Sequence, residues 1–127
     1  MRVTKAEDMA ESFSKAFNSG NAESIASLYE PEAVIVTPTG EACKGQEAIR
    51  QVLNGFLALK GTIKIEVRYC FQTGDIALTS SRWTLHGTGP DGASVNMQGT
   101  TAEVVRRQTD GSWLYIVDHP FGADSPL

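Results

Sequence analysis

The sequence predicts an α+β protein in which helices pack on one face of a curved, mostly antiparallel sheet. Apolar residues recur at three- and four-residue steps up to Gly61, which is the period of amphipathic helices, and at two-residue steps after it, which is the period of strands. The chain has 127 residues, of which 41% are hydrophobic and 20% are charged, as in one globular domain. We therefore expect a single domain over 1–127, with its core over about 4–122.

Two helices are predicted at the beginning of the chain. Thr4 and Glu7 have the spacing of a capping box, and the apolar stripe that follows them ends at residues 18–20, where a glycine favours a helix end. Asn21 is a good capping residue for a second, short helix, which Pro31 ends.

The rest of the chain is predicted to hold one more helix and several strands. A short strand is expected over 33–37, and a third helix between Gly45 and Gly61. Four long strands follow, and tight turns at Gly74-Asp75 and Asp110-Gly111 mark two of the three hairpins. These strands are expected over 63–71, 76–86, 94–108 and 112–119.

The tight turns also predict how the strands pair. With two-residue loops, Val67 lies opposite Arg82, and Glu103 lies opposite Asp118. Under this register, Arg82, Glu103 and Asp118 gather within an otherwise apolar inner face. Neighbouring carboxylates repel each other unless a cation or a shared proton intervenes.

These three residues are the candidate catalytic group. A carboxyl that stays protonated at neutral pH can act as a general acid or can donate to an oxyanion. Glu103 or Asp118 would then exchange a proton with a ligand, and Arg82 would hold an oxyanion or a carboxylate. The same residues are also compatible with a salt bridge that only stabilises the sheet.

An apolar pocket is expected between the helices and the inner face of the sheet. Large apolar side chains are the usual lining of small-molecule sites. His119 would reach the mouth of the pocket if its strand bulges, and would otherwise be a hydrogen-bonded residue at the strand end. The other candidate ligand-binding residues are Phe13, Phe17, Tyr29, Val36, Phe56, Val67, Tyr69 and Ile116.

The opposite face of the sheet is expected to be a subunit interface. The register places a set of large apolar residues there, more than a monomer comfortably exposes. We therefore predict a homodimer whose sheets pack back to back. The residues of this predicted face are Trp83, Leu85, Val104, Tyr115 and Val117.

Composition disfavours several other classes of protein. The net charge is −4 and no basic stripe follows the chain, which argues against nucleic-acid binding. No run of eighteen apolar residues is present, so no membrane span is expected. Cys43 and Cys70 stand far apart, which favours two reduced thiols and a cytoplasmic location over a disulfide. No metal site and no cofactor are predicted, because the two histidines lack further ligands at metal spacing.

Four segments resemble the nuclear transport factor 2-like superfamily, in the branch that includes polyketide cyclase-like and ketosteroid isomerase-like proteins. The segments are 13–29, 32–40, 44–49 and 110–119. The resemblance implies a cone-shaped α+β barrel that encloses an apolar pocket, and it implies that dimers are common.

The resemblance implies less about the reaction. Where the isomerase has a tyrosine on the first helix and a base aspartate before a proline, this sequence has Phe13 and Thr37. Glu103 lies where the isomerase has its late-strand acid. Steroid isomerisation by that mechanism is therefore disfavoured, while a rearranged site that uses Glu103, Asp118, Arg82, Tyr29 or His119 stays open.

Three functional hypotheses follow. The first is a pocket protein that acts on an apolar carbonyl compound, as an isomerase-like or cyclase-like enzyme. The second is a ligand-binding or protein-association module without chemistry, as in the kinase association domains and transport factors of the superfamily. The third is a stable domain whose buried charges are purely structural.

Overall fold

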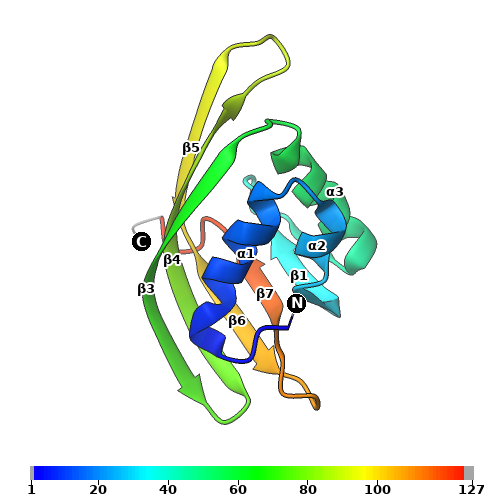
Figure 1. Cartoon of the computed structure of the whole chain (residues 1–127), viewed down its shortest axis with the longest axis vertical. Helices are drawn as coiled ribbons and strands as arrows, with labels where there is room; N and C mark the ends of the chain where they lie inside the picture. Colours follow the sequence, from blue (N-terminus) through cyan, green and yellow to red (C-terminus); the bar gives the residue numbers. More distant parts are fainter. Residues whose placement is uncertain (1, 125–127) are drawn as a thin grey trace.

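The computed structural model describes residues 2–124 and has three α-helices on one side of a seven-stranded sheet (Figure 1). A short 3₁₀ helix, η1 (Ala6–Asp8), leads into α1 (Met9–Asn18), α2 (Ala22–Ala26) and, later, α3 (Gln46–Leu57). The strands are β1 (Tyr29–Val36), β2 (Ala42–Lys44), β3 (Thr62–Thr73), β4 (Ile76–Thr88), β5 (Ser94–Thr100), β6 (Ala102–Arg107) and β7 (Trp113–His119).

The sheet is mixed and open. Its strand order is β2-β1-β7-β6-β4-β3, and β5 pairs with the second half of β4 while β6 pairs with the first half. Only β1 and β7 run parallel. The α+β class and the curved, mostly antiparallel sheet are confirmed, but the sheet does not close into the predicted barrel.

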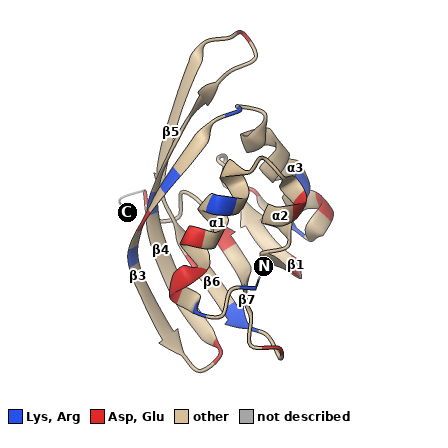
Figure 2. Cartoon of the chain, in the orientation of Figure 1, with Lys and Arg blue, Asp and Glu red and all other residues tan. Residues whose placement is uncertain are grey.

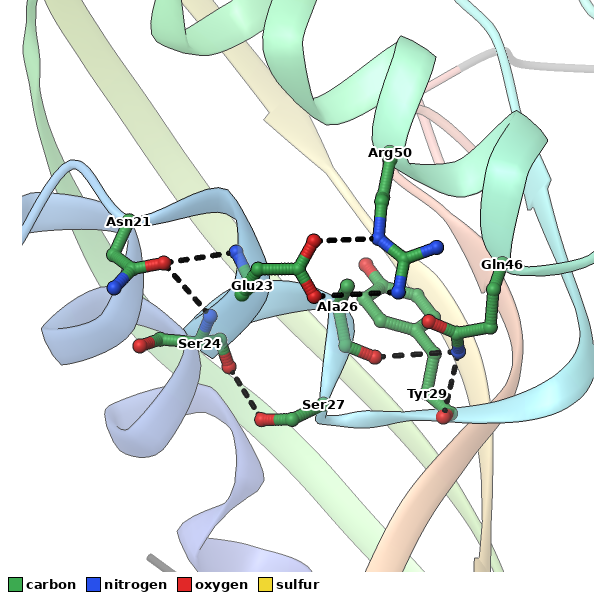
Figure 3. A network of polar contacts seen from close by, with 8 residues as sticks. All are labelled: Asn21, Glu23, Ser24, Ala26, Ser27, Tyr29, Gln46 and Arg50. Carbon is green, nitrogen blue, oxygen red and sulfur yellow. Dashed lines mark hydrogen bonds and ion pairs between the residues drawn. The ribbon is translucent and has the colours of Figure 1, made fainter.

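The beginning of the chain differs from the prediction in two places. No side-chain cap precedes η1, so the capping box of Thr4 and Glu7 does not form. The second helix ends at Ala26, because Tyr29 already pairs with Tyr115 of β7 and begins β1. The predicted role of Asn21 is confirmed, since its side-chain oxygen accepts the backbone N–H groups of residues 23 and 24 (Figure 3).

Three irregularities decide which side chains point toward the helices. The segment predicted as one strand over 94–108 is interrupted at Thr101, which separates β5 from β6. Arg68 is an extra residue in β3, where the pairing shifts from Tyr69–Ser80 to Val67–Ser81. Ile116 is an extra residue in β7. Each such β-bulge reverses the face on which the following residues lie.

The core lies between the three helices and the inner face of the sheet. Met9, Phe17, Ile49 and Leu53 bury the inner sides of α1 and α3. The sheet contributes its own buried residues, among them three that were predicted on the outer face. These are Trp83, Leu85 and Tyr115, and the prediction was wrong because the bulges turn them inward.

The outer face instead carries a row of apolar residues on neighbouring strands. Phe71 pairs with Leu78, Leu78 with Val104, and Val104 with Val117. Phe71 is 65% exposed, Leu78 44% and Val117 37%. Since the helices lie on the other side of the sheet (Figure 1), this outer row has no partner within residues 2–124.

Charged residues of both signs are interspersed along the helices and strands, and those of residues 2–124 form no continuous basic stripe (Figure 2). Within the described residues, no helix is both long enough and apolar enough to cross a membrane.

Candidate functional site

A cavity of about 50 Å³ lies between the helices and the inner face of the sheet. About 10–15 Å³ of such space holds one water molecule, so the cavity has room for a few waters or a small ligand. Its walls are apolar and include four aromatic side chains, and one end is polar. The polar end is formed by Ser81, Thr101, Glu103, Tyr115 and Asp118.

Two buried carboxyls dominate the polar end. Glu103 of β6 lies directly opposite Asp118 of β7, as predicted, and the two residues are 8% and 4% exposed. Both side chains point toward the helices and line the cavity. Directly opposed residues of an antiparallel pair have Cβ atoms about 4.5–5.5 Å apart, so one small group of a ligand can contact both carboxyls.

Two threonines hold the Glu103 carboxyl. The hydroxyls of Thr79 and Thr101 donate to its Oε1 atom over 3.1 and 2.8 Å. Thr101 can serve in this way because of the interruption between β5 and β6. There its Oγ1 accepts the backbone N–H of Ser81 over 2.9 Å, which leaves the hydroxyl proton for Glu103.

A tyrosine holds the Asp118 carboxyl. The Tyr29 hydroxyl donates to Oδ2 of Asp118. The backbone of Tyr29 is fixed where α2 meets β1, since the Gln46 side chain of α3 donates to the carbonyls of Ala26 and Tyr29 over 3.3 and 3.1 Å (Figure 3).

An ion pair joins the same two helices beside this junction. The Arg50 guanidinium of α3 donates to the Glu23 carboxylate of α2 over 2.8 Å (Figure 3). The backbone at Tyr29 is therefore fixed by the packing of both helices. This fixes where the Tyr29 hydroxyl reaches the polar end of the cavity.

Burial sets the charge of the two carboxyls. It raises the pKa of Asp118 to about 6, although the hydrogen bond from Tyr29 acts in the opposite direction. Burial, followed by the negative charge of Asp118, raises the pKa of Glu103 to about 8, against the two threonine hydroxyls. At neutral pH the pair therefore holds one proton, with Asp118 as the carboxylate and Glu103 as the acid.

Two tyrosines complete the polar end. Burial and the neighbouring carboxylates raise the pKa of Tyr29 and of Tyr115 well above the ordinary value, so both hydroxyls keep their protons. The two rings lie 5.1 Å apart between centroids. Within residues 2–124, no hydrogen bond uses the Tyr115 hydroxyl, and this side chain lines the cavity.

Arg82 does not join the carboxyls, which corrects the predicted group. The register is as predicted near the hairpin turn, but the bulge at Arg68 sets Arg82 opposite Glu66 instead of Val67. Its guanidinium lies 3.5 Å from the Glu66 carboxylate on the outer face, where the Arg82 side chain is 62% exposed. Among the described residues that line the cavity there is no lysine, arginine or histidine.

The predicted wall residues fall into two groups. Phe13, Phe17 and Phe56 line the cavity, and Tyr29 reaches it through Asp118. The other four do not line this cavity. Val36 is turned away by the alternation of β1, in which Ile35 points inward, and Ile116 is the extra residue of β7. Val67, which is 48% exposed, and Tyr69, which stacks on Phe71, line a small adjoining cavity instead.

His119 does not line the cavity either, because Asp118 before it takes the inward position. Its Nδ1 atom is buried and has no hydrogen-bond partner within residues 2–124, and the cavity is bounded there by Pro120. In the same part of the chain, no group of three or more His, Cys, Asp or Glu side chains could hold a metal ion.

Several cavity residues were not predicted, and three of them lie on β4. Ser81, Trp83 and Leu85 alternate along β4 in phase with Thr79 and point inward, and all three line the cavity. This alternation is visible in the sequence, but it was assigned to the wrong face. Trp83 is held across the sheet by a 2.8 Å hydrogen bond from its indole to the Pro120 carbonyl.

A glycine makes that arrangement fit. A Cβ atom at Gly99, opposite Trp83 on β5, would lie 2.7 Å from the indole nitrogen and 2.9 Å from the Pro120 carbonyl oxygen. Any residue with a Cβ atom at position 99 would clash with the Trp83 indole, so only glycine fits there.

Solved structures share this fold. A ketosteroid isomerase-like protein from Erwinia carotovora is 20% identical, with a TM-score of 0.80 and 94% of each chain covered. A protein from Xanthomonas campestris, described as a candidate calcium/calmodulin-dependent protein kinase II association domain, is 24% identical, with a TM-score of 0.77, 94% of this chain and 86% of that chain covered. A candidate dehydratase of the nuclear transport factor 2-like family from Streptomyces avermitilis is 20% identical, with a TM-score of 0.72, 87% and 88% covered.

These identities show the fold and not a common activity. No curated protein matches the chain. The profile of the SnoaL-like domain family, however, matches residues 10–116, which is most of the chain. This protein therefore belongs to the SnoaL-like domain family of the nuclear transport factor 2-like superfamily.

Proposed function

We propose that this protein is an isomerase-like or cyclase-like enzyme that moves a proton on a small, apolar carbonyl compound. The observation that carries the proposal is the buried pair of Glu103 and Asp118 at the polar end of an apolar cavity. Two carboxyls whose environments separate their pKa values can serve as base and acid at the same pH.

Each carboxyl has one role in the proposed reaction. The Asp118 carboxylate removes a proton from the carbon next to the carbonyl, and the electrons of that C–H bond move onto the carbonyl oxygen. Glu103 donates a hydrogen bond to the developing enolate oxygen. Asp118 then returns the proton to a carbon of the enolate, so no co-reactant is consumed.

The neighbouring residues support these roles. Thr79 and Thr101 donate to Oε1 of Glu103, so its Oε2 atom is left to carry the proton. The hydrogen bond from Tyr29 acts to lower the pKa of Asp118 and so favours its carboxylate form. Phe13, Phe17 and other apolar side chains surround the cavity and limit the access of water to an enolate.

The proposal is tested by exchange of carbon-bound hydrogen for deuterium. Small ketones and lactones are incubated with the protein in D₂O, and loss of the α-hydrogen signal is followed by NMR. Removal of a general base typically lowers a rate by about 10²–10⁴-fold, which is the effect expected of Asp118→Asn. Glu103→Gln should also slow exchange, whereas Glu66→Gln on the outer face should not.

Two results would count against the enzyme. Exchange that is unaffected by both Asp118→Asn and Glu103→Gln would refute proton transfer by this pair. Exchange no faster than in buffer for every compound would favour the second candidate, a ligand-binding or protein-association module. The exposed row of Phe71, Leu78 and Val117 is the observation that favours a module.

The outer row also supports a homodimer as part of the proposal, with the two sheets packed back to back as predicted from the sequence. The interface would use Phe71, Leu78, Val104 and Val117 instead of the tryptophan, leucine and tyrosine that the structure buries. A cytoplasmic location is retained as well, because Cys43 and Cys70 are both free thiols.

A further inference from the structure

The polar end of the cavity holds two facing carboxyls, and no lysine, arginine or histidine of residues 2–124 lines it. Glu103 and Asp118 are opposed and buried, and neither forms an ion pair within residues 2–124. The arginine that could have neutralised them, Arg82, pairs with Glu66 on the other face. A buried carboxyl pair must share a proton or receive a positive charge from elsewhere.

Three hydrogen-bond acceptors converge on the cavity there. Thr79 and Thr101 occupy Oε1 of Glu103, and Tyr29 occupies Oδ2 of Asp118, so each carboxyl has a second oxygen without a partner from these groups. The third acceptor is the hydroxyl of Tyr115, whose side chain lines the cavity beside the two carboxyls.

An alkylammonium group matches this arrangement. It has three N–H donors, no acceptor and one positive charge, and so it can satisfy three acceptors and compensate a carboxylate at once. The aromatic walls, among them Phe13, Phe56 and Trp83, suit the hydrocarbon part and favour a nearby cation through their ring faces.

We propose that this cavity binds small, apolar primary amines in their ammonium form, with the nitrogen held by Glu103, Asp118 and the Tyr115 hydroxyl. Space for a few waters corresponds to a ligand of about six non-hydrogen atoms, such as a branched five-carbon amine. This inference concerns binding and goes beyond the proton-transfer reaction. An amine that fills the site would ionise Glu103 and thereby remove the acid that the proposed reaction needs.

The carboxyl pair holds one proton at neutral pH. If the bound ammonium faces two carboxylates, binding must therefore release that proton. The titratable groups that face the pair are Tyr29 of β1 and Tyr115 of β7, and both keep their protons. Glu7 of η1 and Tyr69 and Cys70 of β3 line a small adjoining cavity that Glu103 also lines. The proton released on binding at neutral pH therefore comes from Glu103.

The test uses three ligands that share a carbon skeleton and differ in the head group: 3-methylbutylamine, 3-methylbutan-1-ol and 3-methylbutanoate. Isothermal titration calorimetry at pH 7 gives each affinity. Because a hydrogen bond to a charged group is the stronger kind, we expect the amine to bind at least about tenfold more tightly than the alcohol, and the carboxylate most weakly. Titration in two buffers of different ionisation enthalpy should show release of close to one proton per amine bound.

Variants locate the site. Glu103→Gln keeps the shape of the protonated acid, and we expect it to weaken the amine about tenfold while the alcohol changes little. Glu66→Gln removes a carboxylate from the outer face and should change neither. Equal affinity for amine and alcohol, an amine affinity that Glu103→Gln leaves unchanged, or no amine binding at millimolar concentration would each overturn the inference.

The outcome is independent of the proposed enzyme. Failure of the amine to bind leaves the deuterium exchange of the proposed reaction unaffected. Conversely, an inactive protein in the exchange assay can still show amine binding with proton release. If both hold, the amine should inhibit exchange competitively, and the alcohol should inhibit it only at higher concentration.

Discussion

The free energy of unfolding of the native protein should fall as pH rises, and Glu103→Gln should abolish most of this decrease. The folded chain holds the Glu103 carboxyl where its charge is unfavourable, with a pKa of about 8 instead of 4.5. Below pH 4.5 both the folded and the unfolded chain carry the proton. Between pH 4.5 and 8 the unfolded chain releases a proton that the folded chain retains, so each increase in pH favours unfolding. Above pH 8 both states are ionised and the loss is complete.

The size of the effect follows from the same values. A tenfold change in proton affinity corresponds to about 1.4 kcal/mol, so a pKa that rises from 4.5 to about 8 costs the native state on the order of 5 kcal/mol at high pH. Glutamine resembles the protonated acid and does not titrate. The free energy of unfolding of Glu103→Gln, relative to the native protein, should therefore increase by this amount between about pH 4 and pH 9.

Urea denaturation at a series of pH values measures the difference directly. Asp118 titrates in both proteins and largely cancels in the comparison. Glu66→Gln is the matched control, because it makes the same chemical change on the exposed outer face, and its stability should follow that of the native protein. A difference between Glu103→Gln and the native protein that stays constant with pH would show that the Glu103 carboxyl is solvated, and the acid–base assignment would be wrong.

Three further predictions concern the residues around the pair and the outer face. Thr101→Val removes a hydrogen-bond donor to Glu103 and the acceptor of the Ser81 N–H. Urea denaturation should show that the free energy of unfolding falls by about 1–3 kcal/mol, and its pH dependence should show a higher Glu103 pKa. Thr101→Ser keeps the hydroxyl and should largely restore both values. Tyr29→Phe removes the hydrogen bond that lowers the Asp118 pKa, so the variant should lose about 2 kcal/mol at pH 8 and less at pH 4, where Asp118 is protonated; an equal loss at both pH values would contradict this. Phe71→Lys should turn a dimer into a monomer in sedimentation experiments without lowering the helical content, and a native protein that sediments as a monomer would remove the proposed interface.

The sequence predicted the fold well because its strongest signals are local. The helical stripes of α1 and α3, the Asn21 cap and the Gly74-Asp75 turn each act within a few residues, and the structure confirms them. The pairing of β1 with β7 joins segments far apart in the chain, and no local pattern indicates it.

The candidate site was predicted in part, and the misplacement of Arg82 has a definite physical origin. The predicted register of β3 and β4 is correct from the turn to Tyr69 and fails beyond the bulge, which is why Arg82 was assigned to the wrong face. A bulge of this kind depends on packing across the sheet and has no signature among the residues of one strand.

The pairing of Glu103 with Asp118 was predicted correctly although the hairpin loop was not. The loop is one residue longer than two, since Arg107 pairs with Trp113, and the extra residue Ile116 then restores the predicted register. The longer loop and the extra residue each shift the register by one residue in opposite directions, so the two shifts cancel between the loop and the carboxyl pair. The hairpin therefore agrees with the prediction at this pair and differs from it between Val105 and the loop.

The extra residue in β3 has a consequence for how this chain can change in length. Tyr69 and Val67 pair with Ser80 and Ser81, which are consecutive, so loss of Arg68 would leave a straight ladder with every side chain still on its present face. A deletion elsewhere in the paired part of β3 would expose the inward-facing isoleucines and bring Lys64 or Glu66 into the core. Length variation in this strand among natural homologues should therefore concentrate at position 68, where gaining or losing a residue does not exchange the two faces.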